Sequence, residues 1–335
     1  MSGAPARARR LLLGLVLLAV LLAVLGCLVG STGFEAWSGW RDDPVALRIV
    51  RDIRLPRSLG AWLAGALLGL AGAIAQGVFR NPLADPYLLG SASGASLFVA
   101  LSMALGGVAP GTGAWLARVG LSGAAFAGAM LALVLTLTLA RGLVHTMRLL
   151  LAGVIVGVVL GALSTMTVIW FPEIMAAQQS FLVGGTVFIG WSAVVLMAVV
   201  LAACLPLAWL CSPLLDALAL GEATARSLGL PLVAGRGCLI VLLALATGSA
   251  VAQAGLIAFV GLAAPHLVRS IARTSHRWLM PLSALTGGTL LAGADLVARA
   301  AIAPRELPVG VLTAVFGGGY LLWLMHRRAH DEEAA

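Results

Sequence analysis

Ten long apolar segments divide this chain, and they restrict its fold more than any other feature. They lie near residues 11–30, 58–79, 88–106, 114–140, 149–170, 191–211, 237–252, 255–270, 279–298 and 308–325. Most have about 20 residues without alternation of apolar and polar positions, the length that a helix needs to cross a hydrocarbon core. Only helices and closed barrels satisfy the backbone in lipid, and the missing alternation excludes a barrel. The sequence therefore predicts an all-α polytopic membrane protein with about ten transmembrane helices in one domain, residues 1–335.

The overall composition supports a membrane location and argues against a nucleic-acid partner. Hydrophobic residues make up 61% of the chain and charged residues only 10%, too few to cover a water-facing surface. A net charge of +8 would suit nucleic acid, but the basic residues stand singly at the ends of apolar segments rather than in a patch with aromatic residues. We therefore expect them to border the lipid bilayer.

Two local features depart from a plain series of spans. A polar segment with two prolines, Arg80 to Pro86, separates the second and third spans and predicts a sharp reversal at the membrane surface. The eighth apolar segment, uninterrupted only from Ala254 to Pro265, is too short to cross a bilayer alone. It is typical of a broken or partly re-entrant helix that is surrounded by protein.

Arginines predict the orientation of the chain in the membrane. All 21 Lys and Arg positions are arginine. If the N-terminus is cytoplasmic, thirteen of the 21 arginines fall on the cytoplasmic side and eight on the outer side, in the direction of the positive-inside bias. Both chain termini are then cytoplasmic, and the outer arginines are concentrated in the first external segment.

Acidic residues are almost absent from the apolar segments, and this argues against ion-coupled transport. Asp295 is the one acidic residue within a predicted span, and Arg299 follows four residues later on the same helix face. That spacing favours a local ion pair. A secondary carrier would need intramembrane acidic groups for coupling, and the chain also shows no internal repeat. We therefore expect the energy for transport to come from a partner protein.

A polar segment between the sixth and seventh spans is the candidate contact site for such a partner. Residues 214–229 are too polar to span a bilayer and predict two short helices, broken at Gly221 and ended at Gly229. The expected apolar contact residues are Leu214, Leu218, Ala225 and Leu228, and the expected polar residues are Asp216, Glu222 and Arg226. Such a pair of helices suits a groove on a soluble protein, or else a position flat on the membrane surface.

Small residues at four-residue spacing predict tight helix packing in two spans. They are Gly65 and Gly69 in the second span and Gly153, Gly157 and Gly161 in the fifth. The fifth span also carries Ser164, Thr165, Met166 and Thr167. Two interpretations stay open for the fifth span: generic helix packing, or a helix that lines a translocation path.

Five short motifs are spread along the chain from the start of the second span to the last span. They are Arg54-Leu55-Pro56-Arg57, Arg80 to Pro86 with Leu89-Gly90, Leu220-Gly221-Glu222 through Leu228-Gly229, Phe259-Val260-Gly261-Leu262 with Pro265-His266, and Glu306-Leu307-Pro308-Val309-Gly310. Together they resemble the FecCD-type permeases, the membrane subunits of type II ATP-binding-cassette (ABC) importers for iron complexes and cobalamin. The resemblance implies the ABC importer type II permease fold.

The resemblance also implies the partners and the location. A permease of this kind works in the bacterial inner membrane as a homodimer, with two cytoplasmic ATPase subunits and an external substrate-binding protein. The permease is then not an enzyme and binds no cofactor or metal itself, because ATP and Mg²⁺ belong to the ATPase subunit. This chain has no lysine and therefore no GxxxxGK[ST] phosphate loop.

By position, the resemblance assigns residues to both membrane surfaces. Arg54, Arg57 and Arg299 resemble external arginines that receive acidic residues of the binding protein, a task that suits the planar guanidinium. The alternative is that they anchor helices at the lipid boundary. The expected contact residues for the ATPase subunit are Leu218, Gly221, Glu222, Ala225 and Arg226.

The sequence constrains the substrate only loosely. A path of Ser, Thr, Met, Gly and aliphatic residues suits a large, partly apolar iron complex better than a bare ion. Within the family we expect haem first, then a ferric siderophore, then cobalamin. We expect a structural role for His266 rather than haem ligation, because it belongs to a motif that the family shares whatever its substrate.

A different class, an intramembrane serine protease, is suggested by Ser91-Ala92-Ser93-Gly94 on the third span. The fit is poor, because the rhomboid pattern needs glycine where Ser91 stands. The histidines also lie at loops or helix ends, without an evident geometry for activating Ser93. We therefore favour the importer.

Overall fold

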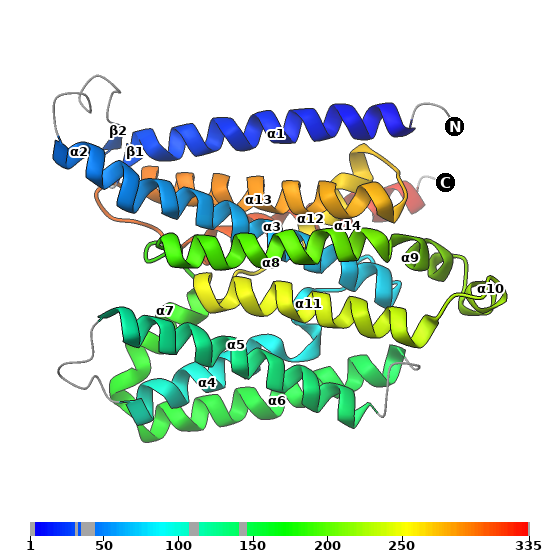
Figure 1. Ribbon diagram of the computed structural model, residues 1–335, viewed down its shortest axis with the longest axis horizontal. Coiled ribbons are helices and arrows are strands. Elements are labelled where there is room, and N and C mark those ends of the chain that lie inside the picture. The colour runs from blue at the N-terminus through cyan, green and yellow to red at the C-terminus, as the bar shows by residue number, and fades with distance from the viewer. Residues whose placement is uncertain (1–3, 31–32, 35–43, 107–113, 141–145, 334–335) are drawn as a thin grey trace.

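The computed structural model describes residues 4–30, 33–34, 44–106, 114–140 and 146–333, and nearly all of them are helical (Figure 1). Helices stand at all ten predicted positions: α1 (Ala4–Leu28), α3 (Leu55–Phe79), α4 (Ser91–Gly106), α5 (Ala114–Leu139), α6 (Thr146–Trp170), α8 (Trp191–Leu210), α11 (Leu232–Ala254), α12 (Val260–Ile271), α13 (His276–Ala300) and α14 (Val309–Glu333). Among the described residues, seven helices are long and apolar enough to cross a membrane. The all-α prediction is therefore confirmed.

Shorter elements connect the long helices. They are the strands β1 (Val29–Gly30) and β2 (Gly33–Phe34), which pair as a small hairpin, the helices α2 (Pro44–Ile49), α7 (Met175–Val183), α9 (Ser212–Ala219) and α10 (Glu222–Ser227), a π-helical turn at Val50–Arg54, and 3₁₀ turns at Pro86–Leu89 and Pro172–Ile174. The hairpin and α7 were not predicted from the sequence. Both are too short to give a periodic apolar pattern.

The long helices run side by side and give the molecule two distinct ends (Figure 1). The start of α1 and the end of α14 lie at the same end as α9 and α10, which we call the α9–α10 end. The hairpin, α2 and α7 lie at the opposite end, which we call the hairpin end. The predicted orientation requires this arrangement, because it places both termini at the same membrane surface as residues 214–229, which we call the coupling segment.

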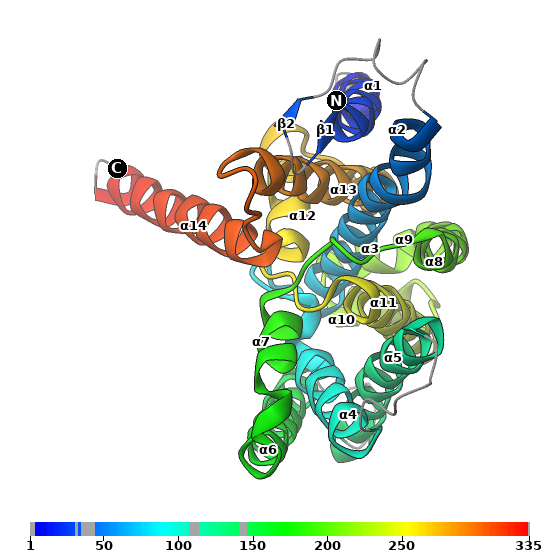
Figure 2. The same cartoon turned by 90° about the vertical axis from the view of Figure 1, so that its left-hand side faces the viewer.

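Helix α3 is the centre of the bundle. In Figure 2, it is surrounded by α13, α12, α8 and α11. Of its most apolar stretch of 18 residues, 89% is buried inside the protein. Helix α1 lies on the outside, and only 6% of its most apolar stretch of 18 residues is buried. One connected hydrophobic core extends from Ala8 to Val309. The second span is therefore shielded from lipid by the others.

Glycines let α3 and α13 approach closely, as the spacing of Gly65 and Gly69 predicted. A methyl group at Gly65 would collide with the carbonyl of Gly287, and one at Gly69 with the carbonyl of Ser283. In the fifth span, a methyl group at Gly153 would collide with the carbonyl of Leu88. Backbone-to-backbone packing of this kind is typical of membrane helices, where dispersion contacts replace the hydrophobic effect as the driving force.

Two predicted breaks are present. The chain reverses after α3 at Arg80, which has the left-handed φ of 50°, and the Asp85 side chain accepts a 2.8 Å hydrogen bond from the Tyr87 backbone N–H. The eighth span is broken as expected: Gly255 to Phe259 is not helical, and α12 has only 12 residues. Such a helix is too short to cross a bilayer, and most of its residues are buried in protein.

The glycine packing of α3 gives a direct test. We expect Gly65→Ala to destabilise the protein by about 1–3 kcal/mol, because the added methyl group forces α3 and α13 apart. Gly120→Ala in α5 is the matched control, because no atom lies within 4 Å of a methyl group there. Unfolding in detergent measures both variants. Equal stability of the two would contradict the close approach of α3 and α13.

Candidate functional sites

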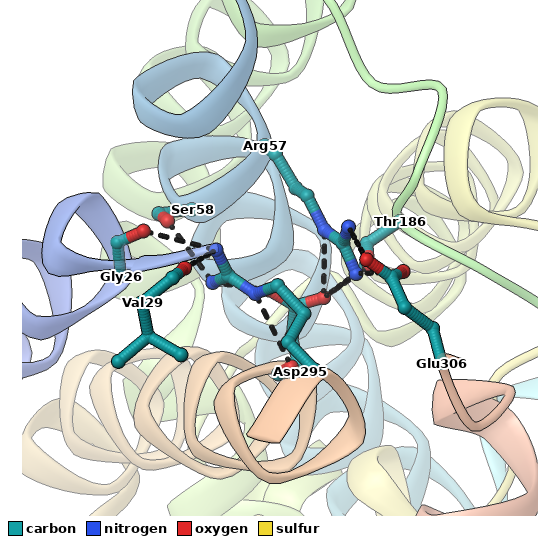
Figure 3. A network of polar contacts seen from close by, with 8 residues as sticks. Gly26, Val29, Arg57, Ser58, Thr186, Asp295 and Glu306 are labelled. Carbon is teal, nitrogen blue, oxygen red and sulfur yellow. Dashed lines mark hydrogen bonds and ion pairs between the residues drawn. The ribbon is translucent and has the colours of Figure 1, made fainter. Parts of the chain in front are cut away.

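A group of four charged residues lies at the hairpin end (Figure 3); we call Arg57, Asp295, Arg299 and Glu306 the charge cluster. The first three are buried and Glu306 is half-buried. Arg57 Nε and Nη2 donate to Asp295 Oδ1 at 3.1 and 3.0 Å. Arg57 Nη1 donates to Glu306 Oε1 at 3.0 Å. Arg299 Nη2 lies 2.7 Å from Asp295 Oδ2, which confirms the predicted local ion pair. Asp295 is 0% exposed, so the pair is shielded from water.

Neutral hydrogen bonds extend the cluster to neighbouring elements (Figure 3). Arg299 Nη1 donates to the carbonyls of Gly26 at 2.9 Å and Val29 at 3.1 Å. The Thr186 hydroxyl donates to Asp295 Oδ1. The cluster therefore joins the end of α1, strand β1, α3, the segment between α7 and α8, α13 and the loop before α14.

The charges of the cluster balance, with two guanidinium groups and two carboxylates. A buried ion pair adds little net stability compared with apolar residues, but removal of one partner leaves an uncompensated buried charge at a cost of about 3–5 kcal/mol. The cluster therefore fixes which elements meet at the hairpin end more than it adds total stability. From the sequence we predicted only the ion pair between Asp295 and Arg299, which are four residues apart. Arg57 is 238 residues from Asp295 and 249 from Glu306, so its two pairings have no local signal.

The three arginines predicted to dock the binding protein are buried. Arg54 and Arg57 are each 7% exposed and Arg299 is 2% exposed. Arg54 Nη1 donates to the Cys27 carbonyl at 3.2 Å, which fastens the start of α3 to the end of α1. The geometry thus gives all three arginines a role in holding helices together. Their docking role stays a prediction.

At the opposite end, α9 and α10 form the predicted pair of short helices. The chain breaks at Gly221 with φ 113°, where a side chain would be strained, and α10 is followed by Gly229 with φ 71°. Glu222 Oε1 accepts from Arg226 Nη2 at 3.2 Å and from Arg236 Nη1 at 3.1 Å. Burial alone would raise the pKa of the Glu222 carboxyl, but the two guanidinium groups outweigh it and lower that pKa.

The apolar face of this segment points into the protein. Leu214 is 6% exposed and Leu218 is 0% exposed, because α9 packs on α3, α8 and α13. Ala225 is 0% exposed, and its helix α10 packs on α9. In this structure these three residues pack within the permease, and their contact with a soluble partner stays a prediction. Leu228 is exposed as expected, and Leu220, which the sequence interpretation did not include, is 71% exposed. The coupling role of the segment as a whole stays a prediction.

Helix α13 connects the two ends of the molecule. Asp216 Oδ1 in α9 accepts from the His276 backbone N at 3.0 Å and lies 2.6 Å from His276 Nδ1. The Arg277 guanidinium lies 4.2 Å from the centre of the Trp209 ring, which adds a cation–π contact with α8. The first turn of α13 therefore holds the coupling segment, and its far end carries Asp295.

The four predicted pathway residues of α6 do not share one environment. Ser164 and Thr167 are 5% and 7% exposed, whereas Thr165 and Met166 are exposed. Ser164 and Thr165 line a cavity between α4, α6 and α7. The pathway role of the four residues stays a prediction. The cavity favours the side of α6 that carries Ser164 and Thr165 as the one that would line a path.

His266 has a partner within the protein. Its Nδ1 lies 2.9 Å from the Tyr320 hydroxyl, and the two rings meet edge to face. His266 is 8% exposed, and its contact with Tyr320 joins α12 to α14. Within the part of the chain that the structure describes, no group of three or more His, Cys, Asp or Glu residues could hold a metal ion.

Residues 15–327 match the FecCD transport family. The chain belongs to this family. Among its relatives, the "Vitamin B12 import system permease protein BtuC" of Klebsiella pneumoniae is 40% identical over 328 residues, 96% of this chain and 95% of the relative. The protein of that name from Salmonella typhimurium is 41% identical over 324 residues, 96% of each chain.

Solved structures agree with this assignment. A metal-chelate type ABC transporter in an inward-facing conformation has a TM-score of 0.85 and 28% identity, covering 95% of this chain and 99% of that one. PsaBC from Streptococcus pneumoniae has a TM-score of 0.57 at 18% identity, covering 85% and 92% of the two chains, and supports the fold alone. The type II permease fold is thus confirmed.

Family membership decides the class of protein. This FecCD-family chain is the multi-pass permease subunit of an ABC importer, and ATP hydrolysis lies on a separate subunit. The serine-protease and secondary-carrier alternatives are therefore excluded.

The break between α9 and α10 gives a test of coupling. We expect Gly221→Val to lower substrate-stimulated ATP hydrolysis by about tenfold while the permease still folds, because a side chain at φ 113° displaces α10. Gly190→Val at the hairpin end is the control, since no atom lies within 4 Å of a methyl group there. Normal stimulation of ATP hydrolysis in Gly221→Val would contradict a coupling role for the segment.

Proposed function

We propose that this permease imports cobalamin, or a closely related corrinoid, with energy from ATP hydrolysis on a partner subunit. The observation that carries the proposal is the identity of 40% to a permease named for vitamin B12 import, over 96% of this chain and 95% of the relative. From the sequence we expected haem first and cobalamin third. The identity to a vitamin B12 permease favours cobalamin over haem. A ferric chelate is the second candidate, supported by the structural similarity to a metal-chelate type transporter.

The proposed assembly is a homodimer with partners at both ends. ATPase subunits bind the α9–α10 end, which is cytoplasmic and carries both termini, and a substrate-binding protein binds the hairpin end. In Figure 2, α14, α7 and α6 lie along one side of the bundle. Large apolar side chains on this side are exposed, including Val158 at 67%, Ile169 at 68% and Phe316 at 63%. Apolar side chains of this kind suit contact with lipid as well as with a second copy.

Docking of the binding protein through Arg54, Arg57 and Arg299 is part of this proposal. Guanidinium groups at the hairpin end suit carboxylates on such a partner. Because these side chains are buried, a partner carboxylate has to displace existing contacts, such as the Cys27 carbonyl on Arg54. Docking and rearrangement of the hairpin end are then linked.

Transport by the complete complex tests the proposal. The permease, its ATPase subunit and its binding protein are reconstituted in lipid vesicles, and ATP-dependent uptake of radiolabelled cyanocobalamin is measured. We expect saturable uptake that unlabelled cobalamin abolishes and that excess haem or ferric siderophore leaves unchanged. A complex with an inactive ATPase subunit is the control. Uptake of a ferric chelate without uptake of cobalamin would contradict the proposal and favour the second candidate.

A further inference from the structure

A cavity of about 420 Å³ lies between α4, α6 and α7, towards the hairpin end. Its polar lining consists of Ser93, Ser96, Ser164, Thr165, Gln178 and Gln179. The apolar part of the wall includes Val168, Met175 and Leu182. We call this cavity the amide pocket.

The pocket has an organised polar floor. Gln178 is 3% exposed, and its Nε2 donates to the Ser96 hydroxyl at 2.8 Å, to the Ser96 carbonyl at 3.1 Å and to the Ser164 hydroxyl at 3.3 Å. The Ser96 and Ser164 hydroxyls are 2.9 Å apart. These contacts join α4, α6 and α7, so the floor is a rigid arrangement of neutral hydrogen-bonding groups.

One acceptor in this floor has no partner. Gln178 Oε1 is buried and makes no hydrogen bond to any residue that the structure describes. An unpaired buried amide oxygen costs about 1–3 kcal/mol, which a donor from a bound molecule would recover. The mouth presents exposed neutral groups on Thr165 and Gln179.

The pocket is uncharged, and this limits what it accepts. None of the described residues that line it is acidic or basic. A carboxylate that left water for this site would have no cation to balance it, whereas a primary amide could both donate to and accept from the lining. Cobalamin carries primary amides around its corrin ring, whereas haem carries two carboxylates.

We propose that the amide pocket contacts the substrate during passage and selects for neutral carboxamide groups over carboxylates. The proposal rests on the proposed corrinoid import and adds the residues that recognise the periphery of the substrate. Gln179 and Thr165 are the contact residues at the mouth. Gln178 is a positioning residue, which holds α7 against α4 and α6.

A charge swap tests the proposal. The complete importer in vesicles is given cyanocobalamin, or cyanocobalamin in which one peripheral amide has been hydrolysed to a carboxylate, and the ratio of the two uptake rates is measured. We expect Gln179→Arg to raise the rate for the carboxylate relative to cobalamin by about tenfold, because the guanidinium supplies the missing cation. The binding protein is the same in all samples, so its own preference cancels.

Gln253→Arg is the matched control, since Gln253 lines a different cavity between α5, α8 and α11. We expect it to leave the ratio unchanged. If Gln179→Arg does not assemble, Thr165→Arg places the same charge in the same pocket. A ratio that stays at the wild-type value in the arginine variants would overturn the amide pocket while the corrinoid function stands. Absence of cobalamin uptake by the wild type would overturn both.

Discussion

The ion pair between Arg57 and Asp295 is the interaction on which the hairpin end of this permease depends. It joins α3, the most buried helix, to α13, and it is completed by Arg299 and Glu306. A charge in an apolar interior is tolerated only with a partner in good geometry, so these residues leave few alternative arrangements. The end of α1, the segment before α8 and the loop before α14 take their positions from the same groups.

The same two helices bring this constraint to the other end of the molecule. Glycines hold the middle parts of α3 and α13 in backbone contact, and the first turn of α13 binds Asp216 of α9 through His276. A movement of α9 therefore acts on the helix that also carries Asp295. This continuity gives a physical route from the proposed ATPase contact to the proposed binding-protein contact. A rigid element biased at both ends is the kind of link that coupling requires.

The sequence predicted what local patterns determine and failed where distant residues decide. Apolar run length predicted the helices, glycine spacing predicted close packing of α3 without its partner, and Gly221 predicted the break before α10, because each signal lies within a few turns of chain. The pairing of Arg57 with Asp295 has no local signal, so it was not predicted. Leu218 and Ala225 lie on the apolar face of an amphipathic pattern. Such a pattern predicts an apolar face, but it does not say whether that face packs on its own chain or on another protein. The Gln178 floor was missed because single polar residues from three helices meet only in the fold.

A double-mutant cycle at Arg57 and Asp295 tests the central claim most directly. The free energy of unfolding in detergent is measured for the wild type, Arg57→Ala, Asp295→Ala and the double variant. If the pair holds the hairpin end, the double variant loses less stability than the sum of the single losses, by about 1–3 kcal/mol, because either single change already breaks the contact that the two side chains share. Single losses that add to within about 0.5 kcal/mol would show that the two charges act independently, and would contradict the account.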